Sequence, residues 1–290
     1  YPIIRRLLQR LETLQRSVQR FGEGDLSVRV SEQGQDEVAD LARQFNAAAA
    51  RIEALVKTHK SLLANASHEL RSPLTRIRMG LELMGGNQPS PAFREEILRN
   101  IAELDQLVDE ILLASRLDAR EADVGTVELV DLIGLAAEEC ARVDAELDVT
   151  AVPEGLEVRG VAKLLRRALR NLLENARRYS QGDITVVLQR HDGQAQLSVL
   201  DRGPGVPPAL RERIFEPFYR LPGASERAGG VGLGLALVRS IAQRHNGSVR
   251  CEDQPDGSGG ACFVLRLPLH SPPGTAAPAP APQRKGTEAK

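Results

Sequence analysis

The 290-residue chain contains no tryptophan, and aromatic residues make up only 3% of it. Proteins that stack nucleobases or sugars need exposed aromatic rings, so the composition argues against such a platform. The formal net charge is −1, which provides no bulk attraction to a phosphate backbone. We therefore expect no nucleic-acid partner.

Cysteine is also scarce. Cys140, Cys251 and Cys262 are scattered along the chain and lack the spacing of zinc ligands. An odd number of cysteines does not make a complete disulfide framework. We expect three free cytosolic thiols.

No apolar run approaches the roughly 18–20 residues that a membrane-spanning helix needs. The chain nevertheless opens with Tyr-Pro-Ile-Ile, followed by Arg5, Arg6 and Arg10. Proline in a first turn, followed by positive charge, is typical of the cytoplasmic end of a transmembrane helix. We expect the cytoplasmic part of a longer protein that is held in the membrane by a helix outside this chain.

Two stretches near the N-terminus repeat apolar residues at heptad spacing, and a polar connector of about 14 residues joins them. The stretches are Ile4, Leu7, Leu11, Leu14, Val18 and Phe21, then Val38, Leu41, Phe45, Ala48, Ile52 and Leu55. The pattern predicts a parallel coiled-coil module that dimerises, and the alternative is a pair of ordinary amphipathic helices. We expect the first helix to break at residues 22–25 and the second to run on beyond residue 60.

A histidine and a carboxylate stand side by side in residues 67–74, Ser-His-Glu-Leu-Arg-Ser-Pro-Leu. The apolar residues around them recur at spacings of three or four: Leu63, Ala66, Leu70, Pro73, Ile77, Leu81 and Met84. At about 100° per residue, His68 lies on the side opposite this seam and should be exposed. An isolated exposed histidine is most often a solvated surface residue. Ser72, one turn later on the same face, could hold a water or a phosphoryl group beside the imidazole.

Residues 85–89 predict a turn that ends this helix. A second helix should follow, with the apolar stripe Ile97, Ile101, Leu104, Val108 and Ile111. Two helices with one stripe each bury little apolar surface alone, whereas two copies make a four-helix bundle. The sequence therefore predicts a homodimer.

From about residue 126 helical patterns alternate with strand patterns. We expect helices over 131–146 and 160–179, and strands over 184–190, 196–200, 248–252 and 262–267. This order predicts a mixed α/β sandwich of about 145 residues. The last twenty residues are rich in proline and alanine and should be disordered.

Asn171 and Asn175 are four residues apart on one predicted helix, so their amides project from the same face. Amide oxygens in a cleft suit Mg²⁺, although a pair of helix asparagines is more often structural. Arg178 and Tyr179 follow one turn later and could meet a phosphate and a flat ring.

Three further segments carry glycines or aromatic residues. Asp201-Arg-Gly203-Pro-Gly205 follows a predicted strand, where the carboxylate could accept a purine amino group or simply form a tight turn. Residues 215–220 place Phe215, Phe218 and Tyr219 directly ahead of a polar run at 221–228, which suits a mobile lid. Alternating glycines at 230–234 open a helix whose free N–H groups could face phosphate oxygens. The spacing is neither a Rossmann fingerprint nor a P-loop.

In this order, the segments resemble the boxes of the sensor histidine kinases of bacterial two-component systems. The H box corresponds to residues 67–74, the N box to 171–180, the G1 box to 201–205, the F box to 215–219 and the G2 box to 230–234. The leading residues resemble the HAMP signal-relay domain, including Pro2, Glu37 and the Phe45-Asn46 pair. The amino-acid sequences of the boxes are most similar to those of inner-membrane sensors of the Cpx envelope-stress type.

The resemblance covers residues 1 to about 268 and implies a multidomain fold. Residues 1–55 would be the HAMP coiled coil, and residues 56–120 a dimerisation and histidine-phosphotransfer hairpin that forms a dimeric four-helix bundle. Residues 126–269 would be an ATP-binding α/β sandwich of the Bergerat (GHKL) type, before a disordered tail at 270–290.

The resemblance also implies the roles of the site residues, with ATP and Mg²⁺ as cofactors. His68 would be the phosphoacceptor and Glu69 its base, before transfer to an aspartate of a response regulator. Ser72 stands where Thr or Asn is usual and would position water for dephosphorylation of that regulator. The nucleotide side would comprise Asn175 and Asn171 for Mg²⁺, Arg178 and Tyr179 nearby, Asp201 for the adenine amino group, Gly203 and Gly205 beside the ring, and Gly230, Gly232 and Gly234 over the phosphates.

Two other functions stay open. The first is a GHKL-type ATPase whose nucleotide drives a conformational change, and the intact histidine box argues against it. The second is a coiled-coil scaffold that keeps an inactive kinase domain. Arg178 in place of a frequent Lys, and Val231 in place of a small hydroxyl residue, depart from the usual pattern without touching the phosphoacceptor.

Overall fold

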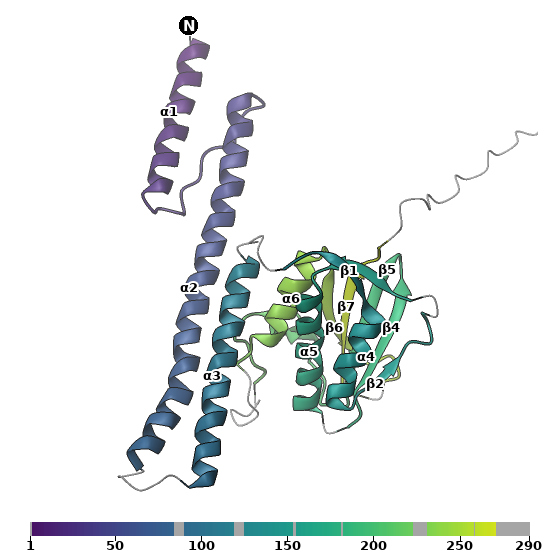
Figure 1. Ribbon diagram of the computed structural model, residues 1–290. Helices are drawn as coiled ribbons and strands as arrows, with labels where there is room; N and C mark the ends of the chain where they lie inside the picture. The colour runs from purple at the N-terminus through teal and green to yellow at the C-terminus, as the bar shows by residue number, and fades with distance from the viewer. Residues whose placement is uncertain are drawn as a thin grey trace, which may run out of the picture. The chain divides into compact units, whose positions relative to one another are not determined.

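The computed structural model, shown in Figure 1, describes residues 2–83, 90–118, 125–152, 155–180, 182–222, 231–257 and 259–270. The chain divides into two compact units, residues 1–122 with 213–240 and residues 123–212 with 241–290. The expectations for Met84, the turn at 85–89, most of the lid, Gly230 and the tail beyond residue 270 lie outside the described residues. None of the described helices combines the length and apolar character that a membrane crossing requires.

The first helix, α1 (Pro2–Gly22), ends where the glycines predict. Its connector leads into α2 (Glu37–Leu83), a helix of 47 residues that carries the H box, as expected. The two helices run in the same direction beside the connector (Figure 1). Asn46 of α2 holds the connector, since its amide accepts from the Val30 N–H at 2.9 Å and donates to the Val30 carbonyl at 2.8 Å. Leu14 is buried, whereas most of the heptad positions are exposed in the single chain.

The second half of α2 packs antiparallel against α3 (Pro91–Asp118) (Figure 1). The side chains buried in this hairpin include Leu62, Ala66, Leu107, Ala114 and Leu117. The predicted seam is only partly buried, because a hairpin of two helices can cover one stripe on each. Large apolar side chains remain exposed on both helices, including Leu63, Leu74, Leu81, Ile101, Val108 and Leu112.

The remaining elements form the α/β part. They are β1 (Glu128–Asp131), α4 (Leu132–Val143), β2 (Glu146–Asp148), β3 (Glu157–Gly160), α5 (Ala162–Tyr179), β4 (Thr185–His191), β5 (Gln194–Leu200), α6 (Gly234–Arg244), β6 (Ser248–Asp253) and β7 (Ala261–Pro268), with single 3-10 turns at Pro208–Leu210 and Arg213–Phe215. The main sheet has the order β2-β4-β5-β7-β6, and β1 pairs with β3 in a separate ribbon. Only β2 and β4 are parallel within the main sheet.

Both predicted helices and all four predicted strands are confirmed, but β1, β2 and β3 are not foreseen. The helix expected over 131–146 is too long. It ends at Val143 because Asp144 adopts a left-handed φ of 57°, and Glu146 already belongs to β2. Strands of three or four residues carry too little alternation to be recognised from sequence.

Helices α4 and α5 cover one face of the main sheet (Figure 1). Asp131 caps α4 by accepting from the N–H groups of Ile133 at 2.9 Å and Gly134 at 3.1 Å. Helix α5 buries one long apolar face, comprising Leu164, Leu165, Ala168, Leu169, Leu172, Leu173 and Ala176. This packing fixes the helix that carries both site asparagines.

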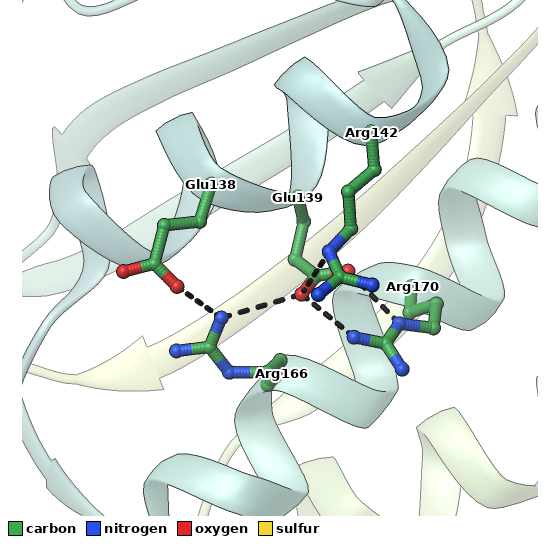
Figure 2. A network of polar contacts seen from close by, with 5 residues as sticks. All are labelled: Glu138, Glu139, Arg142, Arg166 and Arg170. Atoms are coloured by element: carbon green, nitrogen blue, oxygen red, sulfur yellow. Dashed lines mark hydrogen bonds and ion pairs between the residues drawn. The ribbon is translucent and has the colours of Figure 1, made fainter.

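A buried carboxylate joins α4 to α5. Glu139 is 1% exposed, and the guanidinium of Arg170 donates to both of its oxygens at 2.9 Å. Arg166 donates to Glu139 at 3.3 Å and also bonds to Glu138, as Figure 2 shows. The hydrogen bonds from Arg170 hold the pKa of Glu139 below its ordinary value. The network therefore stabilises the α4–α5 contact while Glu139 is ionised.

Glu139→Gln is expected to lower the free energy of unfolding by about 1–3 kcal/mol at pH 7, because it removes a buried carboxylate that accepts charge-assisted bonds from Arg170 and Arg166, whose side chains are 31% and 36% exposed. The pKa of Glu139 is lower in the folded chain than in the unfolded chain. The stabilisation by its carboxylate is therefore complete above the ordinary pKa of 4.5, and it is lost as the pH falls through the folded pKa. Urea titrations at pH 7 and pH 4 should show the wild-type advantage shrinking in acid.

The matched control is Glu138→Gln, because the Glu138 side chain is 62% exposed and shares Arg166. Exposed ion pairs contribute only about 0–1 kcal/mol, so this variant should stay close to the wild type. Equal destabilisation by both variants would contradict the assignment of the anchoring role to Glu139.

Candidate active site

The phosphoacceptor candidate lies on the open side of α2. His68 and Ser72 are exposed, Glu69 is half-buried and Pro73 is buried within the helix. The expected exposure of His68 is confirmed. Pro73 has no N–H, so the carbonyl of Glu69 loses its ordinary helical partner next to the histidine. The imidazole of His68 is therefore accessible to another domain or molecule that contacts this face of α2.

Ser72 has a partner that its sequence position did not suggest. Its Oγ accepts a hydrogen bond from Nη1 of Arg76 at 3.1 Å. The same guanidinium donates to Asn100 at 2.7 Å and to Glu103 at 2.8 Å, both on α3. The H box is thereby tied to the second helix of the hairpin.

The N box lies on α5 as expected. Asn171 is 5% exposed and Asn175 is half-buried one turn later. Arg178 and Tyr179 are exposed at the end of the helix. Asn175 is thus the more accessible of the two amides.

Asp201 directly follows β5 and is 3% exposed. Its Oδ1 accepts from the N–H groups of Gly203 at 2.8 Å and Ala261 at 3.2 Å. Among the described residues no donor bonds to the other carboxylate oxygen, Oδ2. The carboxylate is held rigidly by backbone groups and keeps one oxygen for a ligand.

The glycines after Asp201 permit close backbone approaches. A Cβ at Gly203 would lie 2.6 Å from the carbonyl oxygen of Tyr179, the last residue of α5. Gly205 has a φ of +73°, and a Cβ there would lie 3.0 Å from the carbonyl oxygen of Gly260. Gly203 therefore lets the G1 segment pack against the end of the N-box helix, and Gly205 lets it pack against the backbone just before β7.

Several supporting residues escaped prediction from the sequence. The Oγ of Ser180 accepts from the N–H groups of Gly182 and Arg202, both at 3.1 Å. The side chain of Gln254 donates to the carbonyl of Asp201. At Gly260 a Cβ would lie 1.9 Å from that carbonyl oxygen. Of these residues, only Gly260 could have been suspected from the sequence. It belongs to the pair Gly259-Gly260 just before β7, and glycines beside a strand often mark a place where another backbone segment comes close.

The F box and G2 box meet at two residues with left-handed backbone. Phe218 has a φ of 63° and Gly232 one of 78°. The N–H of Phe218 donates to the carbonyl of Gly232 at 3.0 Å, and a Cβ at Gly232 would lie 3.0 Å from the Phe218 Cα. Gly234 begins α6, which confirms that the alternating glycines open a helix.

The three cysteines offer no reactive thiol. Cys140, Cys251 and Cys262 are free and buried, in agreement with the prediction that they are unpaired. Burial raises the pKa of Cys140 and Cys262 to about 11 and that of Cys251 to about 12. These thiols therefore stay protonated at neutral pH and are not nucleophiles.

Comparison with known proteins places these groups in three domains. Residues 3–54 match the HAMP domain, residues 58–120 the His Kinase A (phospho-acceptor) domain and residues 160–271 the histidine kinase-, DNA gyrase B- and HSP90-like ATPase. The chain is 36% identical over 262 residues to the sensor protein RstB of Escherichia coli, an alignment that covers 88% of the chain and 59% of RstB. The chain belongs to the sensor histidine kinases.

Two further sensor histidine kinases are similar over most of the chain. CpxA of Escherichia coli is 35% identical over 82% of the chain and 53% of its own length, in agreement with the resemblance of the boxes. A histidine-protein kinase/phosphatase of Mycobacterium, MprB, is 35% identical over 81% of the chain and 48% of its own length. The chain thus spans about half the length of these curated relatives.

Solved histidine kinases share the fold. ThkA, solved in complex with the response regulator TrrA, has a TM-score of 0.60 and 24% identity, covering 81% of this chain and 68% of that one. AdeS of Acinetobacter baumannii has a TM-score of 0.58 and 22% identity, covering 70% of this chain and 98% of that one. The chain therefore shares the fold of these histidine kinases, and its residues 160–271 are the part that matches the ATPase family model.

Proposed function

We propose that this chain is the kinase portion of a sensor histidine kinase. It transfers the γ-phosphoryl group of ATP to His68 and then to an aspartate of a response regulator. The observation that carries the proposal is the exposed His68 on a helical hairpin, in a chain that also holds the backbone-fixed carboxylate of Asp201. A GHKL ATPase without phosphotransfer would have no use for such a histidine.

His68 attacks the γ-phosphorus in line through Nε2. The new N–P bond forms as the bond between that phosphorus and the bridging oxygen breaks, and ADP leaves. Glu69 takes or orients the Nδ1 proton. Because His68 is exposed on α2, the imidazole can reach a nucleotide that another domain brings to it.

The residues around Asp201 suit an adenine ring. Oδ2 is the oxygen that would accept the adenine amino group, since the bonds from Gly203 and Ala261 both go to Oδ1. Gly203 and Gly205, which approach the backbone of Tyr179 and Gly260 closely, would lie beside the ring. Gly232 and Gly234, with Gly230 before them, would bring N–H groups to the phosphates, and Arg178 and Tyr179 would lie at the edge of the site.

The described residues contain no cluster of three or more His, Cys, Asp or Glu side chains that could hold a metal ion. A Mg²⁺ ion would therefore depend on amide oxygens together with the phosphates, and Asn175 is accessible for this while Asn171 supports it from the same face. When bound, the ion neutralises charge on the phosphates.

Asn175→Ala is expected to weaken ATP binding by at least about tenfold when Mg²⁺ is present, because an inner oxygen ligand is lost. The weaker binding in EDTA should stay unchanged, which separates the metal role from a folding defect. A fluorescent ATP analogue titrated with and without Mg²⁺ measures both. Unchanged affinity in Mg²⁺ would count against the metal role.

The test of the kinase activity is incubation of the purified chain with γ-labelled ATP. We expect label on the chain that is stable in alkali and lost in acid, the behaviour of phosphohistidine. ATP hydrolysis without such label would favour the GHKL ATPase. Neither label nor hydrolysis would favour the inactive scaffold.

We also propose that the hairpin forms a homodimeric four-helix bundle. The support is a set of large apolar side chains that are exposed in the single chain. They are Leu74 and Leu81 on α2, and Ile101, Val108 and Leu112 on α3. A parallel dimer of α1 and the start of α2 would cover the heptad positions in the same way.

Val108→Glu is expected to shift the chain to a monomer, with dimer affinity weakened by more than about 100-fold, because two unpaired carboxylates would be buried at one symmetric interface. Sedimentation velocity measures the change. Asp109→Asn, one residue along on the exposed side of α3, is the control and should remain dimeric. A dimeric Val108→Glu protein would place the interface elsewhere.

The partner we propose is the receiver domain of a response regulator. Reversal by Ser72 is part of the proposal, supported by the name of MprB, a kinase/phosphatase. We further propose attachment to the bacterial inner membrane through a segment outside this chain, with these domains in the cytoplasm. The domains would be residues 1–55, 56–120 and 126–269, with a tail at 270–290. The first two are close to the family models at 3–54 and 58–120, whereas the third would begin well before its family model at 160–271.

A further inference from the structure

One guanidinium links the H box to α3. Arg76 donates from Nη1 to Ser72, from Nε to the Oδ1 of Asn100 and from Nη2 to Glu103, at 3.1, 2.7 and 2.8 Å. Asn100 is only 6% exposed, and its own amide donates to the carbonyl of Glu96 at 2.8 Å. Each partner thus fixes a different nitrogen, so the guanidinium has one defined orientation above Ser72.

Ser72 differs from the other hydroxyl residues of this helix. The hydroxyls of Ser67 and Thr75 donate to the carbonyls four residues earlier, Leu63 and Arg71, both at 2.8 Å. This is the usual bond for serine and threonine within a helix. No described residue accepts from the Ser72 hydroxyl, whose oxygen instead accepts from Arg76. Ser72 therefore keeps its hydrogen and one lone pair for an outside group.

Without a restraint, Ser72 could make the same bond as Ser67 and Thr75. A serine side chain turns freely and can return to the backbone carbonyl four residues earlier. A charge-assisted bond from a fixed guanidinium selects one orientation of Ser72. Arg76 thus keeps the Ser72 hydroxyl from turning back to the helix backbone.

We propose that Arg76 is a positioning residue for dephosphorylation of the response regulator, a step that rests on the proposed function. Ser72 holds a water molecule with the lone pair that Arg76 leaves free. The water oxygen bonds to the phosphorus of the aspartyl phosphate, and the bond from phosphorus to the carboxylate oxygen breaks. Inorganic phosphate and the aspartate leave, and the proton of the water goes to solvent. Because Asn100 and Glu103 belong to α3, the alignment of α2 with α3 sets the orientation of Ser72.

The experiment compares Arg76→Gln in two backgrounds, the wild type and Ser72→Ala. The substrate is chosen by testing the receiver domains of all response regulators of the source genome with the labelled full chain. The receiver that takes up labelled phosphate fastest is used. Release of inorganic phosphate from this receiver reports dephosphorylation, and labelling of the kinase by ATP reports autophosphorylation. Arg78→Gln is the matched control, because Arg78 lies on the same helix and pairs only with the exposed Glu82 among the described residues.

We expect Arg76→Gln to slow dephosphorylation by about tenfold, the effect of one charge-assisted hydrogen bond, and to change autophosphorylation by less than about twofold. In the Ser72→Ala background the same substitution should slow the remaining dephosphorylation by less than about threefold, since no hydroxyl is left to orient. Arg78→Gln should behave as the wild type.

An equal loss in both backgrounds, or a parallel loss of autophosphorylation, would show that Arg76 only holds the hairpin together and would overturn the proposal. A wild-type chain that phosphorylates the receiver but never dephosphorylates it would also overturn the proposal, while the kinase function would stand. A chain that takes no label from ATP would instead refute the kinase function itself.

Discussion

The His68→Gln protein should take no label from ATP while its affinity for ATP stays within about twofold of the wild type. Glutamine has a similar size but an amide nitrogen that is not nucleophilic, so the N–P bond cannot form. Since His68 is exposed on α2, the substitution removes little packing and should leave the fold intact. Labelling with γ-labelled ATP and titration with a fluorescent ATP analogue measure the two effects.

His59→Gln provides the matched control. His59 lies on the same helix and is half-buried nine residues before His68. This variant should be labelled as fast as the wild type. Label on the His68→Gln protein, or its loss from the His59→Gln protein, would sink the assignment of the phosphoacceptor.

Asp201→Asn should weaken ATP binding by at least about 100-fold. An asparagine oxygen can still accept from the Gly203 and Ala261 N–H groups, so the local fold is preserved. The NH₂ group would then replace Oδ2 and set a donor against the adenine amino group. Loss of a charge-assisted bond and the new mismatch together amount to about 3 kcal/mol. Isothermal titration with ATP measures the effect.

Asp192→Asn is the control for Asp201→Asn, because Asp192 lies in the β4–β5 turn with its side chain 87% exposed and a φ of 48° that asparagine also adopts. It should bind ATP as the wild type does. Thermal unfolding should place all three proteins within a few degrees. Tight ATP binding by the Asp201→Asn protein would contradict the proposed adenine contact.

Features that depend on neighbours along the chain could be predicted. The exposure of His68 follows from a 3.6-residue period, because a helix has one buried face wherever it packs. The same reasoning placed both asparagines on α5 and the alternating glycines at the start of α6, and the structure agrees. Alternation also located β4, β5, β6 and β7 within one or two residues of their observed ends.

Contacts between distant segments could not be predicted. Arg76 and Asn100 are 24 residues apart, and Asp201 and Ala261 are 60 apart, so no periodicity relates them. Short strands such as β2 exist because a neighbour supplies their hydrogen bonds, and their own three residues hold no pattern. The left-handed φ of Asp144 ends α4 early. Aspartate adopts this conformation only occasionally, so the residue type alone does not predict where the helix ends.

The amino-acid order alone was sufficient for the domain types and for the exposure of His68, since the boxes, the heptads and the helical period are local in sequence. Folding added the groups that hold those side chains in place. Backbone N–H groups from two segments fix the carboxylate of Asp201, and α3 orients Ser72 through Arg76. The physical reason is that a hydrogen bond depends on distance and angle in space, which only the packing of helices and strands sets.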